Sequence, residues 1–217
     1  MIKTIIFDMD GTLLNTLDDL TICTNEILTR HNYPNRTISE MRNFVGNGIK
    51  KMIERALPSK MSSDIINNCY EEMLEFYKLH SGDHTMPYYG VKVLLEKLKK
   101  TCNVNIAIVT NKAQESAEEI GYNFFGNSVD IIVGDDKITP LKPNPDNILK
   151  VLNKFNCELT DAIYIGDSEV DIATAKNSNL NFIAVSWGFR DKSFLLEQGA
   201  NIIANNAEEL YDILKTL

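Results

Sequence analysis

Short runs of β-branched and other apolar residues recur along the chain and alternate with longer segments of helical periodicity. The six runs span residues 2–7, 104–109, 130–134, 162–166, 181–185 and 201–204. Between the later runs, segments such as GVKVLLEKLKK and EVDIATAKNS place apolar residues three and four positions apart. Near-continuous apolar strands that alternate with helices are typical of βαβ units. We therefore predict an α/β fold, with a Rossmann-like, mostly parallel sheet covered by helices on both faces.

The interval 16–84 interrupts this alternation, because it contains no strong strand candidate. Its segments TLDDLTICTNEILTRHN, SEMRNFVGNGIKKMIERAL and SSDIINNCYEEMLEFYKLH are typical of three or four amphipathic helices. The stretches TISE (37–40) and SSD (62–64) supply N-caps for two of them. We predict a core domain formed by residues 1–15 and 85–217, and a helical cap domain, 16–84, inserted after the first strand.

Polar clusters follow four of the predicted strands. They are Asp8 and Asp10 in DMDGT, Thr110 and Asn111 after the second run, Lys142 in LKPNP, and Asp167 in GDS with Asp171 one helical turn further on. Ligands of open parallel sheets bind beyond the carboxyl ends of the strands. We therefore expect these side chains to meet at one edge of the sheet.

Each cluster also has a plain structural interpretation. DMDGT could form a turn, although Leu13 stands where an EF-hand loop requires glycine. Thr110 could bond to the backbone at a strand end, Lys142 could be a solvated lysine, and Asp167 could cap a helix. Four such coincidences at one edge are improbable, so a shared site is the better interpretation.

Phosphoryl transfer is the chemistry that fits these residue types. Two carboxylates about 4 Å apart repel by roughly 4 kcal/mol at an effective dielectric near 20. A hard cation such as Mg²⁺, surrounded by Asp8, Asp10 and Asp167, would offset this repulsion. Thr110 and Lys142 could then hold phosphoryl oxygens. One aspartate would attack phosphorus, and the other would act as general acid and base.

Composition narrows the class of partner. The 217 residues carry a formal net charge of −8, with a pI near 5.0, which argues against a nucleic-acid partner. We expect no membrane span, no signal peptide, four free cysteine thiols and a cytoplasmic location. The expected partner is a small phosphorylated metabolite, and the choice between monomer and dimer stays open.

The motifs DMDGT, IVTN, LKP and GDSEVD, in this order, resemble those of the haloacid dehalogenase superfamily of aspartate-nucleophile phosphatases. The resemblance covers essentially the whole chain. The helical insert resembles the cap of the phosphoglycolate phosphatase and β-phosphoglucomutase-like branch. VTNK (109–112) and VSWGFR (185–190) resemble the phosphoglycolate phosphatase group most closely.

This resemblance implies a role for each polar residue. Asp8 would be the nucleophile and Asp10 the general acid and base. Mg²⁺ would be held by the Asp8 carboxylate, the Asp10 backbone carbonyl and Asp167, and Asp171 would be a second carboxylate on the metal side. Thr110 and Lys142 would bind the phosphoryl group, and Asn111 would line the same site.

The function implied is Mg²⁺-dependent hydrolysis of a small phosphate monoester, 2-phosphoglycolate first, through an aspartyl-phosphate. Alternatives within the branch are a pyrophosphatase, a nucleotidase and a sugar-phosphate phosphatase or mutase. A non-catalytic phospho-receiver or regulatory module is the alternative from another class. In the cap, we expect Arg42, Gly46, Asn47 and Gly48 to contact substrate, although Arg42 could equally be a solvated helix residue.

Overall fold

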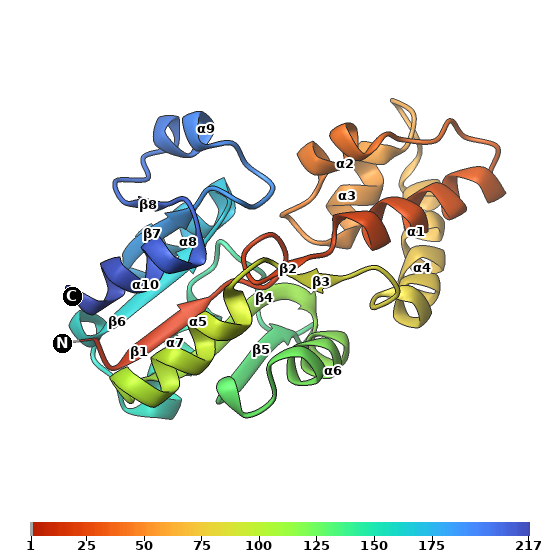
Figure 1. The fold of residues 1–217 in the computed structure, drawn as a ribbon. Helices are drawn as coiled ribbons and strands as arrows, with labels where there is room; N and C mark the ends of the chain where they lie inside the picture. Colours follow the sequence, from red (N-terminus) through yellow and green to blue (C-terminus); the bar gives the residue numbers. More distant parts are fainter. Residues whose placement is uncertain (1) are drawn as a thin grey trace. The chain divides into compact units, whose positions relative to one another are not determined.

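The computed structural model describes residues 2–217, which form two compact units (Figure 1). The core unit contains the residues up to Leu14 together with Pro87–Leu217. The cap unit is the segment Asn15–Met86. The chain thus leaves the core unit after its first strand and returns to it 72 residues later.

The core unit contains a six-stranded parallel sheet in the order β5-β4-β1-β6-β7-β8. The strands are β1 (Thr4–Phe7), β4 (Asn105–Ala113), β5 (Ile131–Asp135), β6 (Ala162–Gly166), β7 (Asn181–Val185) and β8 (Ile203–Ala204). Each overlaps one of the six predicted apolar runs, although β4 and β5 extend beyond the ends of theirs, and the predicted α/β fold is confirmed. Two strands of two residues each, β2 (Leu14–Asn15) and β3 (Met86–Pro87), pair in a separate sheet and were not predicted. Two residues are too few for a periodic pattern.

Strand β1 lies at the centre of the sheet, and all four of its residues are buried. Its side chains alternate between two apolar clusters: Ile5 and Phe7 belong to one, and Ile6 to the other. Residues of α5 (Val91–Lys97), α6 (Gln114–Phe125) and α10 (Ala207–Lys215) complete the first cluster. Residues of α7 (Asp146–Phe155) and α8 (Glu169–Ser178) complete the second. Helices therefore cover both faces, which is why the strands are apolar throughout.

The remaining core elements are short. They are the π-helical turn Leu98–Cys102, the 3₁₀ turns Gly126–Ser128 and Leu159–Asp161, and α9 (Lys192–Glu197).

The cap unit consists of α1 (Leu17–Arg30), α2 (Ile38–Phe44), α3 (Ile49–Ala56) and α4 (Ser63–His80). Both predicted N-caps are present. Thr37 forms a capping box with Glu40, and the Ser62 hydroxyl accepts the Ile65 N–H. In the described part of the chain, no helix combines the length and the hydropathy that a membrane crossing needs.

The segment 39–57 forms two helices because the chain turns sharply at Gly46 and Gly48, where φ is +112° and +80°. Glycine adopts such values without steric cost. Arg55 of α3 holds this loop: it donates to the Phe44 carbonyl at 2.8 Å and to the Asn47 side-chain oxygen at 2.8 Å. The loop is therefore fixed from within the cap unit.

A buried carboxylate ties the two ends of the cap unit together. Asp19, in the first turn of α1, is 1% exposed. It accepts the backbone N–H groups of His84 and Thr85 at 2.9 Å, and the Thr85 hydroxyl at 2.6 Å. Three donors compensate a carboxylate that would otherwise be costly to bury.

Candidate active site

The first predicted pair of carboxylates lies at the carboxyl end of β1. Asp8 is 7% exposed, and its Oδ1 accepts the Met9 N–H at 2.7 Å and contacts Lys142 Nζ at 2.8 Å. Within the described residues, no hydrogen bond reaches the other carboxylate oxygen, Oδ2, of Asp8. Asp10 is less buried, with 23% of its side chain exposed. The two aspartates thus differ in environment, which favours different chemical roles.

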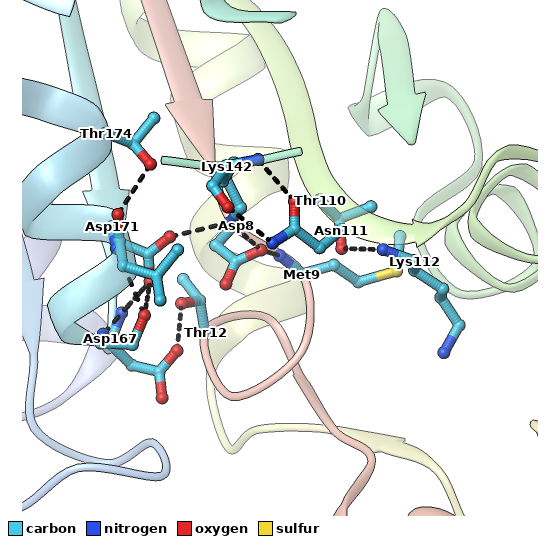
Figure 2. Close-up of polar contacts among 12 residues, drawn as sticks. Asp8, Met9, Thr12, Thr110, Asn111, Lys112, Lys142, Asp167, Asp171 and Thr174 are labelled. Carbon is cyan, nitrogen blue, oxygen red and sulfur yellow. Dashed lines mark hydrogen bonds and ion pairs between the residues drawn. The ribbon is translucent and has the colours of Figure 1, made fainter. Parts of the chain in front are cut away.

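Lys142 is the central cation of the site (Figure 2). Its side chain is 3% exposed, and its Nζ lies 2.8 Å from Asp8, 2.8 Å from Asp171 and 2.9 Å from the Tyr164 hydroxyl. Asn111 positions the backbone of Lys142: its side-chain oxygen accepts the Lys142 N–H at 2.8 Å, and its amide donates to the Lys142 carbonyl at 3.2 Å. The lysine is therefore held at both its backbone and its ammonium, unlike a solvated surface lysine.

Asp167 is 1% exposed and follows β6. Its Oδ1 accepts the Thr12 hydroxyl at 3.0 Å, and its Oδ2 accepts the Phe189 N–H at 2.7 Å. Two glycines make room for this carboxylate. A Cβ on Gly11, where φ is +90°, would lie 2.4 Å from Asp167 Oδ2, and one on Gly188 would lie 2.3 Å from the Gly11 carbonyl oxygen. The glycine of DMDGT and the loop after β7 therefore shape the site together.

Asp171 has a different set of partners. It is fully buried at the third position of α8, where it forms a capping box with Ser168. Its Oδ1 contacts Lys142 Nζ at 2.8 Å and accepts the Tyr164 hydroxyl at 2.6 Å. Its Oδ2 accepts the N–H groups of Asp167 and Ser168 and the Ser168 hydroxyl. Five donors thus surround this one carboxylate.

Burial and neighbouring charges shift the pKa values of these groups in different directions. Burial, reinforced by the Asp171 carboxylate, raises the pKa of Asp8 well above its usual range, and Lys142 only partly opposes it. Burial, again with Asp171, raises the pKa of Asp167 to about 7. Burial would also raise the pKa of Asp171, but the Lys142 ammonium and its hydrogen bonds hold it below the usual value. Burial would lower the pKa of Lys142, but Asp171 and Asp8 raise it above the ordinary lysine range.

The donor set fits a hard divalent cation. One oxygen from each of Asp8, Asp167 and Asp171 lies within 4.8 Å of the others, and all three residues are buried. The donors are oxygen only, as Mg²⁺ prefers. Burial and the Asp171 carboxylate raise the pKa values of Asp8 and Asp167, and the Lys142 ammonium compensates their negative charge only in part. A cation bound between them would supply it.

Thr110 and Lys112 lie near the carboxyl end of β4, where the register with β5 shifts between Val109 and Ala113. Thr110 is buried, and its hydroxyl accepts the Lys112 N–H at 3.2 Å. Lys112 Nζ lies 3.5 Å from Asp10 Oδ1, and only 3% of its side chain is exposed. Sequence reasoning assigned Lys112 no role. The alternation of a strand, which places residues 110 and 112 on one face, is the signal that could have found it.

Hydrogen bonds, ion pairs or close carboxylate oxygens link five of the predicted core residues directly: Asp8, Asn111, Lys142, Asp167 and Asp171. The other two, Asp10 and Thr110, both contact Lys112. The four predicted cap residues belong to the other unit. Arg42 lies on α2, and Gly46, Asn47 and Gly48 form the loop between α2 and α3.

The model of the haloacid dehalogenase-like hydrolases matches residues 5–185, from β1 to the end of β7. The chain belongs to this family. It lies in the phosphoglycolate phosphatase-like branch and is a phosphoric monoester hydrolase. The matched range contains all four predicted motifs.

Three relatives match over nearly their whole length. A phosphoglycolate phosphatase of Psychrobacter arcticus is 31% identical over 98% of this chain and 93% of its own. An N-acetylmuramic acid 6-phosphate phosphatase of Pseudomonas aeruginosa is 27% identical over 98% of this chain and 95% of its own. A crystal structure from Lactobacillus delbrueckii subsp. bulgaricus superposes with a TM-score of 0.93 at 30% identity, and 98% of each chain is covered.

Proposed function

We propose that this protein is a Mg²⁺-dependent phosphatase that hydrolyses 2-phosphoglycolate through an aspartyl-phosphate on Asp8. The observation that carries the proposal is the buried Lys142 ammonium, which contacts Asp8 and Asp171 at 2.8 Å beside the third carboxylate, Asp167. A buried cation next to a carboxylate with one uncommitted oxygen suits an in-line attack on a phosphoryl group.

In the first step, an oxygen of Asp8 attacks phosphorus, and the bond between phosphorus and the ester oxygen breaks. Asp10 gives its proton to the departing ester oxygen, so the alcohol leaves neutral. Lys142 and the Thr110 hydroxyl stabilise the negative charge on the equatorial phosphoryl oxygens. Asp10 suits the role of acid because its side chain remains partly exposed, whereas Asp8 is held by two donors on Oδ1.

In the second step, Asp10 takes a proton from a water molecule, whose oxygen attacks the phosphorus of the aspartyl-phosphate. The bond between phosphorus and the Asp8 oxygen breaks, and inorganic phosphate leaves. The carboxylate of Asp8 is regenerated, and Asp10 is again protonated. The net reaction consumes one ester and one water.

The Asp8 carboxylate, the Asp10 backbone carbonyl and Asp167 would hold Mg²⁺, which supplies positive charge for the phosphoryl oxygens when bound. We assign Asp171 to positioning rather than to direct ligation. Its two oxygens accept five hydrogen bonds, one of them from the Lys142 ammonium, whereas Asp167 accepts one on each oxygen among the described residues. Its part is to hold the Lys142 ammonium against Asp8.

The substrate is the finer part of the proposal. Several of the similar proteins are named phosphoglycolate phosphatases, among them those of Psychrobacter arcticus and Chromobacterium violaceum. One relative of similar coverage is named for a sugar phosphate, N-acetylmuramic acid 6-phosphate. Sugar 6-phosphates are therefore the second candidate class.

Phosphate release tests the proposal, measured with Mg²⁺ and after chelation. The panel holds 2-phosphoglycolate, N-acetylmuramic acid 6-phosphate, pyrophosphate and a nucleoside monophosphate. We expect Mg²⁺-dependent release, with kcat/KM for 2-phosphoglycolate about a hundredfold above the others. A lead by another compound would replace the substrate but keep the site.

The variant Asp8→Asn tests the nucleophile. We expect kcat to fall by at least about 10⁴-fold, and the covalent phosphoryl adduct of the acid-quenched wild type to be absent. Asp212→Asn is the matched control, because Asp212 lies exposed on α10. If Asp8→Asn kept wild-type turnover, the nucleophile assignment would be wrong.

A further inference from the structure

A second buried lysine, Lys112, contacts Asp10, the proposed general acid. Lys112 Nζ lies 3.5 Å from Asp10 Oδ1, whereas Lys142 Nζ contacts Asp8 and Asp171. Figure 2 shows that the Lys112 side chain extends away from Thr110 and ends apart from Lys142. The two ammonium groups therefore pair with different carboxylates of the site.

The place of Lys112 relative to a bound substrate can be inferred from the role of Asp10, and this inference rests on the proposed function. A general acid lies within hydrogen-bond distance of the oxygen that it protonates. With Nζ at 3.5 Å from Asp10 Oδ1, the ammonium lies no more than about 7 Å from the leaving ester oxygen when Oδ1 is the oxygen that donates the proton. In 2-phosphoglycolate, the carboxyl carbon is only one methylene away from that oxygen. A carboxylate there can reach ion-pair distance of Lys112.

Charge and burial also favour an anion beside Lys112. The site holds four carboxylates, those of Asp8, Asp10, Asp167 and Asp171, and a divalent cation would compensate the three inner ones. Lys112 has 3% of its side chain exposed, so its charge is weakly screened by water. An ammonium has three N–H donors, and contact with Asp10 is compatible with contact to a substrate anion.

We propose that Lys112 is the residue that recognises a negatively charged group on the leaving side of the substrate, namely the carboxylate of 2-phosphoglycolate. The same chemistry would also accept the second phosphoryl group of pyrophosphate. Lys112 is thus a specificity-determining residue, and Lys142 binds the phosphoryl group that is transferred.

The test compares three substrates that share a phosphoryl group. Ethyl phosphate has a methyl group where 2-phosphoglycolate has its carboxylate. Pyrophosphate is the second substrate with an anionic leaving group, which is phosphate. The variants are Lys112→Met, Lys112→Gln and Lys112→Arg, with Lys100→Met as the control because Lys100 is 76% exposed. The readout is the ratio of kcat/KM for each anionic substrate to that for ethyl phosphate.

We expect the 2-phosphoglycolate ratio to fall by about 10- to 100-fold in Lys112→Met, mainly through KM. Lys112→Arg should restore most of the ratio, and Lys100→Met should match the wild type. A general loss of structure would lower both rates and leave the ratio unchanged. Lys112→Gln, which keeps a polar side chain, gives the same comparison if the methionine variant does not fold.

Each failure has its own pattern. A wild type that prefers 2-phosphoglycolate, with the preference retained in Lys112→Met and Lys112→Gln, overturns the role of Lys112 and leaves the proposed function intact. A wild type that prefers pyrophosphate, with the preference lost in these variants, supports Lys112 and overturns the proposed substrate. A wild type that treats all three substrates alike overturns both.

Discussion

Replacing Lys142 with methionine removes the ammonium that contacts both Asp8 and Asp171, while keeping a side chain of similar length. Breaking a buried ion pair from one side costs about 3–5 kcal/mol, because an uncompensated charge stays buried. The Tyr164 hydroxyl also loses its 2.9 Å contact to Nζ. In a protein of this size, 1 kcal/mol corresponds to about 2–4 °C in Tm. We therefore expect Lys142→Met to lower Tm by roughly 6–20 °C.

A double variant separates lost packing from lost charge compensation. Asp171→Asn in the Lys142→Met background removes the stranded charge. The asparagine oxygen can still accept the N–H and hydroxyl of Ser168, and its amide can donate to the Tyr164 oxygen. The double variant should therefore be more stable than Lys142→Met by at least about 1 kcal/mol, although it carries one more substitution.

Urea unfolding of metal-free protein at neutral pH measures both effects, with activity measured in parallel. Lys150→Met is the control: Lys150 pairs with Asp136 at the surface, with 48% of its side chain exposed, and should change stability by less than about 0.5 kcal/mol. Both Lys142 variants should lack phosphatase activity. Wild-type stability in Lys142→Met, or a double variant less stable than the single one, would refute the compensation argument.

Three further predictions concern the surroundings of the site. Gly188→Ala should lower activity at least about tenfold and stability by about 1–3 kcal/mol, because its Cβ meets backbone at 2.3 Å; Gly82→Ala, with open space around it, should change neither. Asp19→Asn should lower the free energy of unfolding by about 1–3 kcal/mol, because the amide of the asparagine would face buried donors. Asp18→Asn, at an exposed position, should leave the free energy of unfolding unchanged in the same thermal unfolding measurement. Metal-free protein should lose stability as pH rises from about 4 to about 7, because folded Asp167, with its pKa raised from 3.8 to about 7, keeps a proton that the unfolded chain releases. Mg²⁺ should then raise Tm more above pH 7 than at acidic pH, and an equal increment at both would contradict this.

The pattern of the chain by itself determined the fold and the location of the site. Strands such as β1 and β6 are buried on both faces, so their apolar residues are nearly continuous and can be recognised locally. Parallel strands also place their carboxyl ends at one edge. For this reason, Asp8 and Asp167 could be placed together although they lie far apart in the sequence.

Only the tertiary structure decided what each polar group contacts. Lys112 and Asp10 are 102 positions apart, and their 3.5 Å contact depends on the pairing of β4 with β1 and on the register shift in β4. The Phe189 N–H that binds Asp167 comes from a loop without periodicity. The five donors to Asp171 come from two separate segments, Lys142 and residues 164–168. Periodic burial leaves a local record in the sequence because it repeats along one element. A hydrogen bond or an ion pair depends on the distance between two atoms, which only the packing of separate elements sets.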